Sequence, residues 1–175
     1  FNTSNLNNRP EQTKTVEMSK DYYVVTLYND QKRNLYAYVD DEDLFGEKVI
    51  YLERDDMSAA TEADYVMVEF FLDWYPVLTD QDMYIMGAIT DWNFDEKNKM
   101  TYDFERKGYA ISLLLKQGYY DYIYAVKDKG QATADVTPIA GDFWETKNEY
   151  TIYLYLFDPT QNYDQLIGVK TVLSH

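Results

Sequence analysis

The chain consists largely of short stretches in which hydrophobic and polar residues alternate. Alternation with a period of two is typical of a strand that buries one face. The clearest example is the stretch 64–72, DYVMVEFFL, in which one side holds Val66, Val68, Phe70 and Leu72. Stretches rich in β-branched and aromatic residues also occur at 21–28, 35–39, 48–52, 82–87, 109–115, 119–126 and 149–156. No stretch shows a helical period, so the pattern predicts an all-β sandwich.

Residues 118–124, GYYDYIY, hold four tyrosines after one glycine. In a strand their side chains point alternately to two sides. One side, which continues to a valine, should pack on the core and holds Tyr120, Tyr122 and Tyr124. The other side holds Tyr119 and Ile123, which we expect to face outward.

A polar stretch with small residues, 55–62, interrupts the series of strands. Such stretches are typical of linkers, so we predict two β units with a junction near residues 57–63. Residues 1–58 would be the C-terminal strands of a truncated N-terminal β domain, and residues 64–175 would form the sandwich. Because about 58 residues bury only a marginal core, the first unit should lean on the second.

The composition excludes several kinds of chemistry. The chain has no Cys, and its single His is the last residue, His175. A zinc–thiolate site, a histidine metal site and a Ser or Cys nucleophile with a histidine base are therefore not expected. The acidic run at 40–43 lacks oxygen donors at the spacing of a calcium loop, and we interpret it as a solvated loop. With 31 acidic residues, pairs of carboxylates arise by accident and do not indicate a glycosidase. We predict no catalytic residue, no cofactor and no metal.

Charge and hydropathy limit the partners. The net charge of −15 repels phosphate backbones, which argues against nucleic-acid binding. No apolar run reaches the roughly 18 residues that a transmembrane helix needs. The chain opens on FNTS without a signal peptide, and we expect a mature or trimmed form of an exported protein.

One set of motifs resembles a family of sugar-binding domains. Residues 83–92, MYIMGAITDW, followed by 116–124, KQGYYDYIY, are similar to the immunoglobulin-like (early-set) sandwich of glycogen- and starch-binding modules. In those modules sugar lies across two Trp, a Lys and an Asn. Trp92 matches the first Trp and Asn148 the Asn, but Ile123 stands at the Lys position and the second Trp is missing. A carbohydrate-binding module with Trp92 and Asn148 is therefore the alternative function, and we expect Trp92 to be a buried anchor instead.

A longer, ordered series of motifs resembles the C-terminal part of the type IX secretion system plug protein family. The series comprises 64–72, 87–92, 100–103, 114–122, 145–152 and 163–168. The resemblance implies a non-enzymatic, periplasmic, outer-membrane-associated accessory subunit. Its implied partner is the large β-barrel secretion translocon, whose periplasmic mouth the family is thought to close.

A docking role requires an exposed surface with anchor residues. Tyr is favoured at protein interfaces because it offers a large, stiff and amphipathic contact area. The tyrosines of this chain exceed the needs of one core. The candidate partner-binding residues are Tyr119, Ile123, Trp144, Tyr153 and Tyr155. The alternative is that these rings only cover a second sheet.

Overall fold

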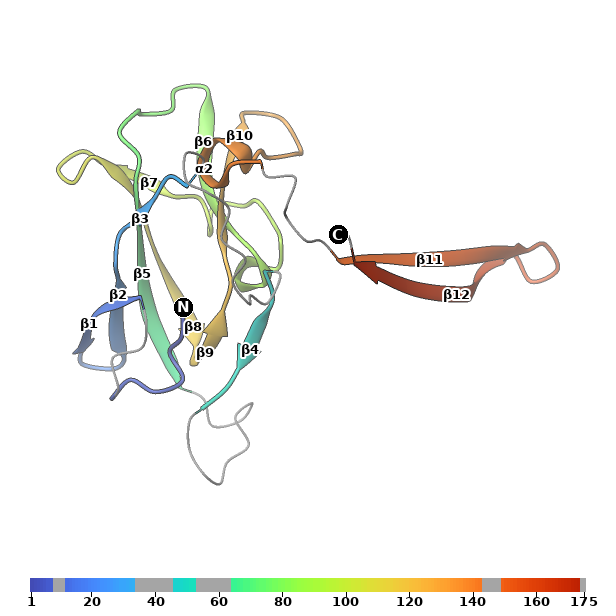
Figure 1. Ribbon diagram of the computed structural model, residues 1–175, viewed down its shortest axis with the longest axis horizontal. Coiled ribbons are helices and arrows are strands. Elements are labelled where there is room, and N and C mark those ends of the chain that lie inside the picture. Colours follow the sequence, from blue (N-terminus) through green and yellow to red (C-terminus); the bar gives the residue numbers. More distant parts are fainter. Residues whose placement is uncertain (8–11, 34–45, 53–63, 143–148, 174–175) are drawn as a thin grey trace. The chain divides into compact units, whose positions relative to one another are not determined.

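The computed structural model describes residues 1–7, 12–33, 46–52, 64–142 and 149–173. The chain divides into two compact units (Figure 1). The first comprises Phe1–Ala37 and Asp41–Asp142, and the second comprises Tyr38–Asp40 and Phe143–His175. We describe each unit by itself.

The larger sheet of the first unit has the strand order β1-β2-β5-β8-β7, and the two-residue strand β3 also pairs with β5. Strands β2 and β3 run parallel to β5, and the other pairs are antiparallel. The strands are β1 (Thr13–Met18), β2 (Tyr23–Leu27), β3 (Asp30–Gln31), β5 (Tyr65–Asp73), β7 (Thr101–Asp103) and β8 (Gly108–Lys116).

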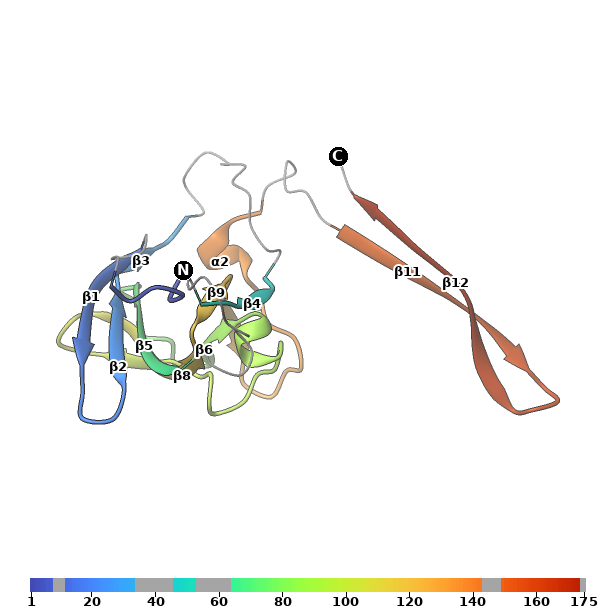
Figure 2. The same cartoon turned by 90° about the horizontal axis from the view of Figure 1, so that it is seen from below.

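The second layer consists of two strand pairs, β6 with β10 and β4 with β9. Their bounds are β4 (Lys48–Ile50), β6 (Gln81–Met86), β9 (Gly118–Tyr120) and β10 (Ile123–Asp128). Two short helical turns, η1 (Ala88–Thr90) and α2 (Thr137–Ala140), lie in the connections. Figure 2 shows this layer facing the larger sheet. The unit is an all-β sandwich, which confirms the predicted fold class. Within the described ranges, no helix has the length and apolar character to cross a bilayer.

One hydrophobic core joins the two layers. The alternating residues of β5 are buried as predicted, and they meet Met83 and Ile85 of β6. Tyr120 and Tyr124 are also buried in this core, and Tyr122 packs against it. The period of two in the sequence therefore identified the core faces of β5, β9 and β10, because burial removes every second side chain of a strand from water.

The unit boundary lies elsewhere than we predicted. Residues 57–63 and the strand expected at 35–39 lie outside the described residues. The described strands on either side of that junction belong to one unit. β2 pairs with β5 along Tyr23–Thr26, and the ring of Phe1 stacks on Tyr120 in the core with centroids 5.2 Å apart. The described part of residues 1–58 is thus integral to the sandwich, because β5 needs β2 to complete its backbone hydrogen bonds.

The second unit contains an antiparallel ribbon of β11 (Glu149–Asp158) and β12 (Tyr163–Leu173). The register shifts by one residue after Leu154, where β12 carries a bulge. The strand expected at 149–156 is confirmed. The sandwich expected to extend to residue 175 does not include this ribbon, which belongs to a different compact unit.

Candidate interaction surfaces

The pairing of β4 with β9 presents apolar side chains to solvent. Val49 lies directly opposite Tyr119, and they are 48% and 36% exposed. Tyr51, two residues beyond Val49, is exposed as well. We call Val49, Tyr51 and Tyr119 the β4–β9 patch. The outward position predicted for Tyr119 is confirmed, whereas no pattern in the sequence indicated that β4 would lie beside it.

Gly118 determines how closely these strands approach. A Cβ atom at this position would collide with the carbonyl oxygen of Val49, so only glycine allows the observed pairing. The N-terminal segment holds β9 from its other edge. The backbone N–H of Thr3 donates to the Gly118 carbonyl at 2.7 Å, and the Gly118 N–H donates to Thr3 Oγ1 at 3.1 Å. The patch therefore stands on a backbone that is paired on both edges.

Ile123 does not belong to the β4–β9 patch. The stretch predicted as one strand, 119–126, forms two strands with different neighbours, and Ile123 begins β10 opposite Met86. Its side chain is half-buried, and Ala125 on the same predicted outward side is fully buried. β9 pairs with β4, whereas β10 pairs with β6. The alternation of inward and outward side chains therefore does not continue unbroken from β9 into β10.

Trp92 is not the buried anchor that we expected. Its side chain is 47% exposed. Asp91 and Trp92 both have positive φ angles, 50° and 58°, at the end of η1. This left-handed turn directs the indole ring away from the core and against Gly46, where a side chain would collide with it. The ring is therefore held over the start of β4, and one of its sides remains accessible.

The other predicted site residues fall outside this surface. Tyr153 and Tyr155 lie on one face of β11 in the second unit, since they are two positions apart in a strand. Trp144 and Asn148 lie outside the described residues. The four described docking candidates thus divide between the two units, and only Trp92 of the two candidate glycan-binding residues is described.

Elsewhere in the first unit, a carboxylate ties the two layers of the sandwich together. Asp30 Oδ2, on β3, accepts hydrogen bonds from the phenol groups of Tyr122 at 2.7 Å and Tyr124 at 2.6 Å. Burial, together with the nearby Asp30 carboxylate, raises the pKa of the Tyr122 phenol far above its usual value. Burial and the neighbouring Tyr122 and Asp30 also raise the pKa of Tyr124. Groups that hold their protons so strongly do not act as bases near neutral pH, and this arrangement stabilises the fold.

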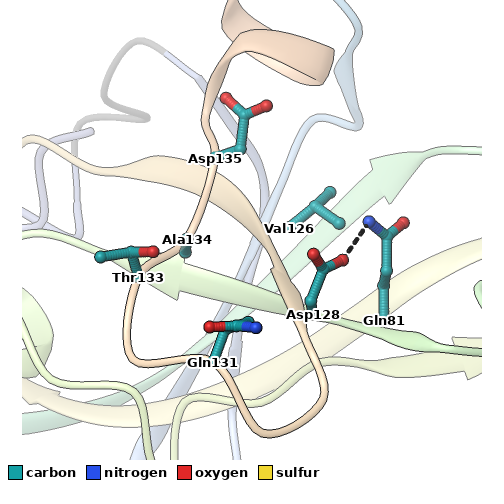
Figure 3. A pocket seen from close by; sticks show the side chains of 7 residues that line it. All are labelled: Gln81, Val126, Asp128, Gln131, Thr133, Ala134 and Asp135. Atoms are coloured by element: carbon teal, nitrogen blue, oxygen red, sulfur yellow. Dashed lines mark hydrogen bonds between the residues drawn. The ribbon is translucent and has the colours of Figure 1, made fainter.

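The cavity in Figure 3 lies beside the loop that follows β10 and has a volume of about 320 Å³. Its lining is polar. Gln81 Nε2 donates to Asp128 Oδ1 at 2.7 Å, while Asp135 points away from both (Figure 3). Among the described residues, no three side chains of the metal-binding types gather into a group. The cavity therefore offers hydrogen-bonding groups without a convergent set of ligands.

The fold and these surfaces define an all-β sandwich with exposed apolar patches and a separate ribbon. Comparisons with known proteins add a structural likeness. No family model matches the chain, and no curated protein matches it. The structure is similar to the crystal structure of a hypothetical protein from Parabacteroides merdae, with a TM-score of 0.89 and 36% identity over 98% of this chain. This chain spans 43% of the length of that protein.

Proposed function

We propose that this protein is a non-enzymatic accessory subunit of the type IX secretion system. It would reside in the periplasm at the outer membrane and dock on the translocon, as the plug proteins that it resembles are thought to do. The motif series supports this proposal. Its motifs fall in sequence order on β5, on the turn around η1, on β7, on β8 with β9, on β11 and on β12, and residues 145–148 of the series lie outside the described residues.

The observation that carries the docking role is the β4–β9 patch. Its side chains are large and uncharged, and their backbone is held by hydrogen bonds on both sides of β9. Anchors of this kind lose little conformational entropy on binding, and a few of them dominate the affinity of an interface. The net charge of −15 favours a partner surface that is basic around its apolar centre.

Docking is tested by co-purification of the full-length protein with the translocon from native outer membranes. Tyr119→Asp and Val49→Asp place a charge in the patch and should abolish co-purification. Leu114→Asp is the matched control, because Leu114 is an exposed aliphatic residue on β8 in the other sheet. Circular dichroism first establishes that each variant is folded. If every folded variant co-purifies as the wild type does, the patch is not the docking surface.

A second candidate function is carbohydrate binding, and the exposed ring of Trp92 favours it. Lys48 Nζ lies close to this turn, where it donates to the Ala88 carbonyl at 2.7 Å and pairs with Asp91 at 3.4 Å. A flat aromatic ring beside a cation is a common sugar platform. Titration of the protein with maltoheptaose or glycogen, followed by tryptophan fluorescence, tests it. A saturable change that Trp92→Ala removes would favour this function over docking.

A further inference from the structure

The ribbon formed by β11 and β12 carries large apolar side chains on both faces. Residues directly opposite each other in a ladder lie on the same face, so the register assigns the side chains. One face holds Tyr150, Ile152, Leu154, Leu156 and Val172. The other holds Tyr153, Tyr155, Phe157, Leu166 and Val169. All ten of these side chains are exposed.

A surface strand normally alternates between an apolar and a polar face. Strands that are apolar on both faces are typical of sheets covered on both sides. Residues 150–157 of β11 contain no charged residue, although the chain carries 31 acidic residues. The residues that pair with them on β12, 164–172, contain two charges, Asp164 and Lys170. A two-stranded ribbon has no interior and is at best marginally stable alone in water. Packing against one sheet would cover only one of its faces, so its stability requires a second layer.

The comparison indicates what supplies that layer. The similar protein from Parabacteroides merdae matches 98% of this chain, so the matched part includes the ribbon. The match uses only 43% of that protein's length, so more than half of that chain lies outside it. A ribbon with apolar side chains on both faces and few charges fits a β domain that accepts two more strands into its interior, rather than a basic or hydrated surface.

We propose that the β11–β12 ribbon is a donated pair of strands, covered on both faces by a further β domain of the same polypeptide. The ribbon completes the fold of that domain and connects it to the sandwich. This role is separate from the docking of the β4–β9 patch, and neither depends on the other.

Hydrogen–deuterium exchange tests the proposal, with this chain compared to the full natural polypeptide that contains it. Covering both faces should slow exchange of the β11 and β12 amides roughly 100-fold in the full polypeptide relative to this chain. Ile152→Asp and Tyr155→Asp each place a charge on one face. In the full polypeptide, each should remove that protection while exchange of β5 and β8 remains slow. Gln161→Asp, in the turn between the strands, is the matched control and should leave the protection unchanged.

Other occupants of the ribbon give different results. Concentration-dependent protection in this chain alone, together with a doubled mass by light scattering, would show a second copy and overturn the proposal. Protection that arises only after addition of purified translocon would place the ribbon in the docking interface instead. The proposal is also refuted if exchange is equally fast in this chain and in the full polypeptide. It is refuted as well if only one of the two variants loses protection, or if the natural polypeptide has no further β domain. Failure of co-purification by the β4–β9 variants would leave this result untouched, so the two proposals fail separately.

Discussion

Replacement of Asp30 tests whether its carboxylate stabilises the sandwich by joining the two layers. Asp30→Ala removes the acceptor of two phenol hydrogen bonds, 2.7 and 2.6 Å long, from Tyr122 and Tyr124. A hydrogen bond to a charged group contributes about 1.5–3 kcal/mol, and a buried hydroxyl left without a partner costs a similar amount. Because Tyr124 is buried and Tyr122 is half-buried, we expect Asp30→Ala to lower the free energy of unfolding by about 3–5 kcal/mol.

Two milder substitutions separate the contributions. Asp30→Asn keeps an oxygen acceptor but loses the charge, and Tyr124→Phe removes one of the two donors. Each should destabilise by about 1–2 kcal/mol. Asp30→Asn weakens both hydrogen bonds by removing the charge of their acceptor, and Tyr124→Phe removes one of the two hydrogen bonds. The control is Asp73→Ala, because Asp73 accepts a hydrogen bond from Asn29 at an exposed position and should change stability by less than about 0.5 kcal/mol.

Urea unfolding followed by circular dichroism measures these differences. The slope of the free energy against urea should stay constant, so that shifts of the midpoint report stability directly. The reasoning is refuted if Asp30→Ala is no less stable than Asp73→Ala. It is also refuted if Asp30→Asn costs as much as Asp30→Ala, because the lost acceptor would then not be the cause.

Three further predictions concern pH, the indole ring and one glycine. Burial raises the pKa of Tyr122 and Tyr124 above the ordinary value of about 10, so the unfolded chain loses these two protons first as the pH rises. The free energy of unfolding should therefore be unaffected by them below about pH 10. Above about pH 10 it should fall by about 1.4 kcal/mol per pH unit for each of the two tyrosines. Thermal unfolding between pH 8 and about 11 measures this, and a flat profile contradicts it. Trp92→Ala should destabilise by only about 1–2 kcal/mol in urea, because the ring is half-exposed, and a loss of about 4 would show that it is an anchor. Gly118→Ala should cost about 2–3 kcal/mol because its Cβ collides with the backbone of β4. Gly168→Ala in the ribbon makes only an ordinary contact with the Leu154 side chain at 3.8 Å and should be nearly neutral in the same assay.

The sequence by itself determined the fold class and much of the core. The alternation along β5 and the inward position of Tyr120 and Tyr124 were predictable, because a strand with one buried face has an apolar residue at every second position. The strand β11 was predictable from its run of aromatic and β-branched residues instead, since both of its faces are exposed. The short strands β3 and β7, with two and three residues, are too short to show a period, and β12 has its alternation interrupted by the bulge.

The pairing of the strands was decided only in the tertiary structure. The parallel pairing of β2 with β5 makes the first part of the chain integral to the sandwich, and the pairing of β4 with β9 creates the patch around Tyr119. The left-handed turn at Trp92 turns its ring outward against Gly46, a residue far away in the sequence. These features depend on contacts between distant segments and on backbone conformation, whereas the hydrophobic pattern records only which side of a strand is buried.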